Sequence, residues 1–252
     1  MNRCILSLVV ILTVGVSGWS QTVTVAAAAN ISAVEAPLKD AFAHSHPGMT
    51  LQFTFGASGA LVTQITQGAP IEVFLSADRG FAQRLVDAGL ATGPVTTYSV
   101  GKLIFLAIKP IDLSQGIDVL LDPAVVQYAN CNPETAPYGR AATDAMIKAG
   151  IYERVKAKQV TAQTITQAVQ YTLTATSFGF INKSALYSKD VQRYNHEGKF
   201  WFEVDPKLYP PIEQGFVVMK SAQTLPEVQA FAAFLLSPEA QKVFAAYGYG
   251  KP

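Results

Sequence analysis

The chain has 252 residues, 50% of them hydrophobic, and 19 basic against 18 acidic side chains give a formal net charge of +1 at pH 7. This balance excludes the basic surplus of nucleic-acid-binding proteins, so we expect no nucleic-acid partner. The length suits one large or two small domains.

The first 20 residues have the pattern of a secretion signal. Arg3 supplies a short positive start, residues 5–16 are almost wholly apolar, and Gly18 and Ser20 place small residues before a cleavage site. The apolar run is too short to span a bilayer comfortably, which makes a short N-terminal membrane anchor the weaker alternative. We therefore expect residues 1–20 to be a signal peptide, the mature chain to start near Gln21, and the protein to be exported to the periplasm.

Removal of the signal would leave a chain without net charge. Arg3 and Cys4 would be lost. The remaining chain would have 18 basic and 18 acidic residues, and Cys131 would be its single cysteine. An internal disulfide is then excluded, and a lone thiol on an apolar strand is more often a small buried hydrophobe than a reactive group. The three histidines lack the spacing of a metal-ligand set. We expect no cofactor.

Three strand–helix units are predicted in the first part of the mature chain. The strands are expected over residues 22–28, 51–55 and 71–75. Each is followed by apolar residues at helical spacing, and Asp78 is placed to cap the third helix. The β-α-β-α-β-α order predicts a parallel sheet.

A long strand predicted over residues 98–108 leads into a second α/β series. Further strands are expected over residues 125–131, from 160, over 177–181 and over 215–219, and helices over 138–149, 164–172, 225–235 and 237–246. Residues 189–211 are polar and aromatic with several turn residues, which indicates a loop-rich segment. This order fits two α/β lobes, with the chain crossing near residue 100 and returning near residue 212. Two crossings would let the lobes hinge around a ligand.

The ends of the first three strands indicate a function. They lead into the small, uncharged turns Ala28-Ala29-Asn30, Gly56-Ala57-Ser58-Gly59 and Ser76-Ala77. Helices that start at such turns present free backbone N–H groups, which is what an anion site needs. Behind a secretion signal, the pattern predicts an exported protein that captures a small oxyanion.

Longer motifs surround these turns, among them Gly68-Ala69-Pro70 with Val73-Phe74-Leu75-Ser76-Ala77-Asp78, and Asn132-Pro133-Glu134-Thr135-Ala136-Pro137-Tyr138-Gly139. In these motifs, and over nearly the whole mature chain, the sequence resembles the periplasmic molybdate/tungstate-binding proteins that serve ABC importers. The resemblance implies an α/β, two-lobed (type II) solute-binding fold, each lobe a mostly parallel sheet flanked by helices, with the ligand cleft between the lobes. The implied lobes are residues 21–100 with 213–252, and residues 101–212.

The same resemblance implies what the protein binds and with which partner it works. It implies high-affinity capture of molybdate, and of tungstate, by a monomer that delivers the ion to the membrane permease of an ABC importer. Relatives hold the dianion through neutral hydrogen-bond donors, so the molybdenum would be bound as an oxyanion without direct ligation of the metal by the protein.

The resemblance also implies the contacts. They are the side chain and N–H of Asn30, the hydroxyl and N–H of Ser58, and the backbone N–H groups of Tyr138 and Ile165. Many relatives have serine at the position of Asn30, and some have a tyrosine where this chain has Asn182. Two possibilities stay open for the fifth contact: the Asn182 amide donates to the ion, or Asn30 replaces the missing donor.

Two alternatives to molybdate capture stay open. The same fold could hold another anion, such as sulfate, phosphate or a small organic anion. A hydrolase that uses Ser58 as its nucleophile is the rival from another class. However, residues 56–60 lack the Gly-x-Ser-x-Gly spacing of a nucleophile elbow, and no base is paired with the serine in the sequence. We therefore expect a binding protein rather than an enzyme, with Asp78 in a structural role.

Overall fold

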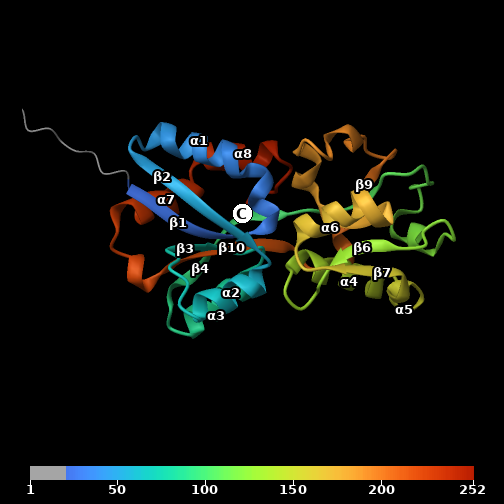
Figure 1. Ribbon diagram of the computed structural model, residues 1–252, viewed down its shortest axis with the longest axis horizontal. Helices are drawn as coiled ribbons and strands as arrows, with labels where there is room; N and C mark the ends of the chain where they lie inside the picture. Colours follow the sequence, from blue (N-terminus) through green and yellow to red (C-terminus); the bar gives the residue numbers. More distant parts are fainter. Residues whose placement is uncertain (1–20) are drawn as a thin grey trace, which may run out of the picture.

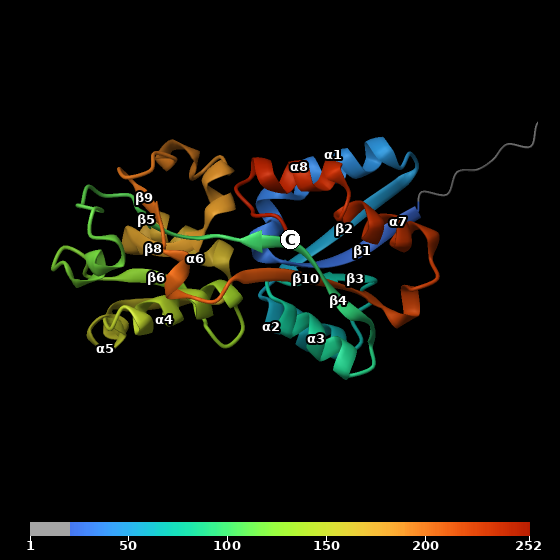
Figure 2. The ribbon, with the colours of Figure 1, turned by 180° about the vertical axis from the view of Figure 1, so that it is seen from behind.

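The computed structural model describes residues 21–252, and the signal peptide predicted over residues 1–20 lies outside the described residues. The described chain forms two lobes side by side, each built on a five-stranded sheet with helices packed on its faces (Figure 1). In both views the C-terminus lies over the part of the first lobe that is nearer the second lobe (Figures 1 and 2). None of the helices within residues 21–252 combines the length and the apolar character needed to cross a membrane.

The first sheet has the strand order β2-β1-β3-β10-β4. Its strands are β1 (Gln21–Ala28), β2 (Met49–Gly56), β3 (Val73–Leu75), β4 (Ala91–Gly101) and β10 (Ile212–Met219). Strand β1 pairs in parallel with β2 and β3, whereas β10 is antiparallel to both β3 and β4. The β-α-β order therefore makes a parallel sheet, into which the returning strand β10 inserts in the opposite direction.

Helices cover both faces of this sheet. They are α1 (Glu35–Ser45), which follows the 3₁₀ helix η1 (Ala29–Val34), α2 (Ser58–Thr66), α3 (Arg79–Asp87), α7 (Pro226–Leu235) and α8 (Pro238–Ala246). On one face, the Phe42 ring meets those of Phe231 and Phe234 with centroids 5.4 and 5.2 Å apart. On the other, α2 and α3 bury Leu61 and Phe81. Edge-to-face aromatic contacts of this kind add to the stabilisation from apolar burial.

The second sheet repeats the arrangement in the order β7-β6-β8-β5-β9. Its strands are β5 (Leu103–Ala107), β6 (Tyr128–Cys131), β7 (Gln159–Ala162), β8 (Phe178–Asn182) and β9 (Trp201–Glu203). Strand β6 is parallel to β7 and β8, and β5 is antiparallel to β8 and β9. In each sheet the opposing strand is thus the first one after a crossing from the other lobe.

Helices α4 (Pro137–Lys148), α5 (Tyr152–Val155) and α6 (Ile165–Tyr171), the last extended by a π-helical turn (Thr172–Thr176), surround the second sheet. Short 3₁₀ turns connect the elements: η2 (Gly116–Leu121), η3 (Lys156–Lys158), η5 (Lys183–Tyr187), η6 (Gln192–Tyr194), η7 (Pro206–Leu208) and, in the first lobe, η8 (Lys220–Ala222).

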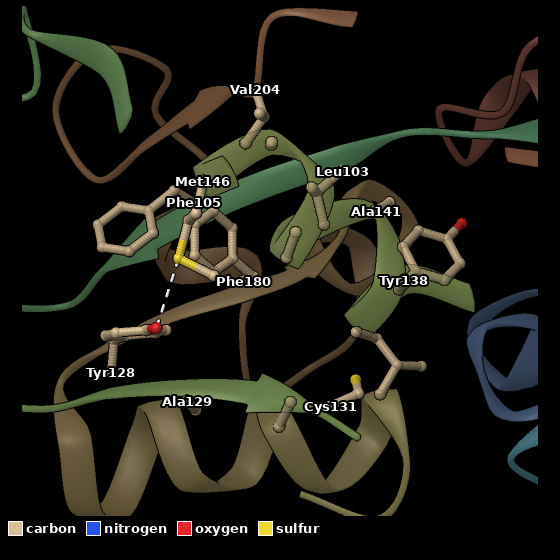
Figure 3. Packing of buried hydrophobic residues seen from close by; sticks show 14 of the residues in the cluster. Leu103, Phe105, Tyr128, Ala129, Cys131, Tyr138, Ala141, Met146, Phe180 and Val204 are labelled. Atoms are coloured by element: carbon tan, nitrogen blue, oxygen red, sulfur yellow. Dashed lines mark hydrogen bonds between the residues drawn. The ribbon is translucent and has the colours of Figure 1, made fainter. Parts of the chain in front are cut away.

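The core between α4 and the second sheet is aromatic (Figure 3). The rings of Phe105 and Phe180 lie 5.2 Å apart, and the Tyr128 hydroxyl lies 3.4 Å from the Met146 sulfur. Cys131 is a buried free thiol, and its burial raises its pKa. The prediction of a small buried hydrophobe at this position is therefore confirmed.

The predicted two-lobed α/β architecture is confirmed, and so are the predicted helices. Among the strands, β3 starts two residues later and β10 three residues earlier than predicted, and three further differences follow. The single strand predicted over residues 98–108 is wrong, because β4 and β5 belong to different sheets and the pairing changes at Lys102. The strand predicted over residues 125–131 starts only at Tyr128. Strand β9 lies in the segment predicted as loop-rich. Strand pairing with distant segments sets these bounds, so the local sequence does not reveal them.

Candidate functional site

A small cavity of about 10 Å³ lies between the lobes, at the carboxyl ends of parallel strands. The residues that line it are Ala28, Ala29, Asn30, Gly56, Ala57, Ser58 and Ala77, and from the second series Ala136, Pro137, Tyr138 and Ile165. Four of the five residues expected to contact a ligand are in this set. Asn30, Ser58, Tyr138 and Ile165 are 1, 1, 2 and 5% exposed, so the lobes are closed over the cavity.

Helix N-termini converge on this cavity. Helix η1 starts at Ala29, α2 at Ser58, α4 at Pro137 and α6 at Ile165. The first N–H groups of a helix have no acceptor within that helix, and together they carry a partial positive charge. Among the described residues, those that line the cavity have no charged side chain. The arrangement can therefore hold an anion through fixed neutral dipoles.

The Ser58 side chain is oriented by a neighbouring turn. The Ala77 N–H donates a hydrogen bond of 3.0 Å to the Ser58 oxygen, which leaves the serine proton for another acceptor. Within residues 21–252, the Ser58 side chain is bonded to that amide and not to a histidine or carboxylate. The pair of nucleophile and base that a serine hydrolase needs is therefore not formed among these residues. Across the same residues, no three His, Cys, Asp or Glu side chains gather as a metal site.

Asn30 is held by a buried network of neutral groups. Its Nδ2 donates to Gln214 Oε1 and to the Tyr249 hydroxyl oxygen, both at 3.1 Å. Its main-chain carbonyl accepts from the Tyr249 hydroxyl at 2.7 Å, while its Oδ1 is buried with no partner recorded in the described chain. Both amide hydrogens are thus engaged, and the group free to meet a ligand is the backbone N–H. The contact between the Asn30 side chain and a ligand that the resemblance implied would require the Asn30 amide to rotate.

The structure places Asn182 behind Asn30 and outside the lining of the cavity. The Asn182 amide donates to Ser184 Oγ at 2.5 Å and to the Asn30 carbonyl at 3.4 Å. Its side chain borders a second cavity, together with Ser32 and Thr166 among others. Asn182 is therefore linked to the cavity through its hydrogen bond to the Asn30 carbonyl.

Buried tyrosines complete the network around the cavity. The Tyr98 hydroxyl donates to Gln214 Oε1 at 2.8 Å, and Gln214 Nε2 donates to the Tyr138 oxygen at 3.3 Å. The Tyr138 ring lies at the edge of the second-lobe core with its hydroxyl pointing away from that core (Figure 3). Burial raises the pKa of Tyr98 and Tyr138, and raises the pKa of Tyr249 to about 12. All three hydroxyls are therefore neutral near neutral pH.

Sequence analysis missed Gln214, Tyr98 and Tyr249 as supports of the site. Gln214 and Tyr249 reach Asn30 across 184 and 219 positions of the chain. A partial signal is the glycine at 101, where an added Cβ would collide with the Tyr138 hydroxyl. A single sequence does not show what that glycine makes room for.

Direct contacts across the cleft join the lobes. Arg140 of α4 forms an ion pair of 3.2 Å with Asp78, and Thr166 Oγ1 donates to the Ala29 carbonyl at 3.3 Å. Asp78 also accepts a hydrogen bond of 2.8 Å from the Phe81 N–H, so the predicted structural role as a helix cap is confirmed. The contacts of Arg140 with Asp78 and of Thr166 with Ala29 hold the two lobes together.

Residues 23–250 match the family described as bacterial extracellular solute-binding protein. The chain is 37% identical over 204 residues to the molybdate-binding protein ModA of Rhodobacter capsulatus, covering 80% of this chain and 78% of that protein. It is 37% identical over 232 residues to ModA of Azotobacter vinelandii, covering 90 and 89%. The solved structure of an Azotobacter vinelandii periplasmic molybdate-binding protein superposes with a TM-score of 0.83 at 29% identity, covering 91% of this chain and 99% of that one.

Proposed function

The chain belongs to the bacterial extracellular solute-binding proteins, and on this premise we propose that it captures molybdate for an ABC importer. The observation that carries the proposal is the convergence of helix N-termini and the Ser58 hydroxyl on one uncharged cavity between the lobes. A permanently charged dianion needs several donors, and fixed neutral dipoles supply them without a counter-charge. The molybdate-binding relatives, similar over most of the chain, support the same ligand.

The proposed contacts are the backbone N–H groups of Asn30, Ser58, Tyr138 and Ile165 and the hydroxyl of Ser58. All four residues line the cavity. In this proposal Asn182 acts indirectly, by donating to the Asn30 carbonyl. The molybdenum stays inside its oxyanion and no protein atom ligates it. The cavity of about 10 Å³ has room for about one water molecule, so in this proposal the lining residues move outward to admit a tetrahedral oxyanion.

Selectivity in this proposal follows from protonation and size. Tungstate has the same charge and shape as molybdate and is bound as well. Phosphate carries protons near neutral pH, and the usual acceptor for such a proton is a carboxylate, which none of the lining residues of the described chain carries. Sulfate is deprotonated, but its shorter bonds leave stretched, weak hydrogen bonds in a cage sized for molybdate.

The same proposal includes the division of the chain into lobes and the partner to which it delivers the ion. Residues 21–100 with 213–252 form one lobe and residues 101–212 the other, and the protein works as a monomer that delivers its ion to a membrane permease. It acts outside the cytoplasm, which the family description supports. It is a binding protein without a reaction of its own and without a nucleic-acid partner. The hydrogen bond from Ala77 to Ser58 supports this against the hydrolase alternative.

Calorimetric titration of the purified protein with molybdate, tungstate, sulfate and phosphate tests the proposal. We expect tight binding of molybdate and tungstate, far weaker binding of sulfate and almost none of phosphate. If sulfate or phosphate bound as tightly as molybdate, the proposal of a molybdate-selective site would be wrong. Ester turnover by the wild-type protein that disappears in Ser58→Ala would instead support the hydrolase.

A further inference from the structure

The Tyr249 hydroxyl meets both lobes behind the proposed ion site. It accepts from Asn30 Nδ2 at 3.1 Å and donates to the Asn30 carbonyl at 2.7 Å. The same oxygen lies 2.9 Å from Ser184 Oγ, in the 3₁₀ turn η5 that follows β8 of the second sheet. One hydroxyl therefore holds Asn30 at its side chain and at its main chain, and ties it to the opposite lobe.

Tyr249 is itself fixed next to a crossing between the lobes. The neighbouring Gly250 exchanges two backbone hydrogen bonds with Val100, of 3.0 and 2.8 Å. Val100 lies at the end of β4, just before the chain enters the second lobe at β5. The Tyr249 ring packs on Phe244 with centroids 5.6 Å apart, and the C-terminus lies over the part of the first lobe that is nearer the second lobe (Figures 1 and 2). The hydroxyl thus has a defined position relative to both lobes.

We propose that Tyr249 is a positioning residue for the ion site: it aligns the Asn30 N–H toward the ion and stabilises the closed arrangement of the lobes through Ser184. It does not line the cavity, so its effect passes through Asn30. The inference rests on the proposed function, because it assigns Tyr249 a role in binding the same ion. The contact with Ser184 holds the lobes together in this closed arrangement, so its loss should favour opening and release of the ion.

The test compares wild type, Tyr249→Phe and the matched control Tyr247→Phe by stopped-flow and calorimetric molybdate binding. The Tyr247 ring packs at a tilt against Tyr187 with centroids 5.3 Å apart, a contact that phenylalanine retains. We expect Tyr249→Phe to lose about tenfold in affinity, mostly through faster release. Tyr247→Phe should bind like wild type. A purely structural role would instead lower the unfolding temperature of the ion-free protein and leave the release rate unchanged.

A double-mutant cycle separates the inter-lobe contact from other effects. Ser184→Ala should speed release in the wild-type background and have a smaller effect in Tyr249→Phe, because both changes remove the same contact. Strict additivity, or normal release in Tyr249→Phe, overturns the inference. If Tyr249→Phe folds poorly, the test rests on Ser184→Ala alone. A normal rate of ion release from Ser184→Ala then overturns the inference. Wild-type protein that binds none of the oxyanions refutes the proposed function and this inference together, whereas normal binding by Tyr249→Phe refutes the inference alone.

Discussion

Gly59 and Thr135 are joined across the cleft by a backbone hydrogen bond of 3.0 Å from the Gly59 nitrogen to the Thr135 oxygen. Gly59 lies in the first turn of α2, beside Ser58, and Thr135 lies just before α4. A Cβ added at Gly59 would come within 3.1 Å of the Thr135 Cα and 2.9 Å of Phe81 Cε1. The absence of a side chain at this position therefore allows the lobes to touch.

Gly59→Ala should disfavour the closed cleft and weaken molybdate binding. The added methyl group would press on the Thr135 backbone of the opposite lobe, which would have to shift for the cleft to close. Calorimetry should show lower affinity, and small-angle scattering at saturating molybdate a larger radius of gyration than for wild type. Gly80→Ala is the matched control, since the nearest atom to its added Cβ is 3.8 Å away. Identical affinity and scattering for Gly59→Ala would contradict this role.

Ser58→Ala should weaken molybdate binding roughly ten- to a hundredfold, because a hydrogen bond to a charged acceptor contributes about 1.5–3 kcal/mol. The variant also leaves the Ala77 N–H without its acceptor, so a modest loss of stability is expected. Calorimetry gives the affinity and circular dichroism checks the fold. Ser221→Ala, at an exposed position, is the control and should bind normally. Unchanged affinity in Ser58→Ala would reject this contact.

Asn30→Asp should make molybdate affinity dependent on pH. A carboxylate at this buried position repels the dianion, and burial raises the pKa of such a carboxyl group. Affinity should be low near roughly pH 8 and should recover toward about pH 5.5 as the carboxyl group takes up a proton. Wild-type affinity should stay nearly flat over this range. Titrations in matched buffers measure both, and a flat profile for the variant would place residue 30 away from the ion.

The free energy of unfolding should fall as the pH rises above about 10. Tyr249 is neutral in the folded protein, with its pKa raised by burial to about 12, whereas an unfolded tyrosine loses its proton near pH 10. Between these values the unfolded chain binds fewer protons, so alkali favours unfolding. Urea denaturation from neutral to alkaline pH measures this dependence. Tyr249→Phe should show a shallower fall, and a stability that rises over this window would contradict the sign.

Much of the architecture follows from local sequence. The strand-to-helix turns after residues 28 and 56, the cap at Asp78 and the two helices that end the described chain are signalled by residues close to one another in the chain. The resemblance to molybdate-binding proteins pointed to Asn30, Ser58, Tyr138 and Ile165, and the structure brings all four to one cavity. That they bind an ion stays a prediction.

Only the tertiary structure decided how these pieces meet. It separated β4 from β5 at Lys102, and it inserted β10 between β3 and β4. It turned Asn182 toward the Asn30 carbonyl and placed the Tyr249 hydroxyl against the same carbonyl, a contact across 219 positions of the chain. Periodicity and capping report the conformation of a segment, whereas the partner of a buried polar group is set by the packing of distant segments. A single sequence carries the first kind of information at each position and leaves the second to the folded chain.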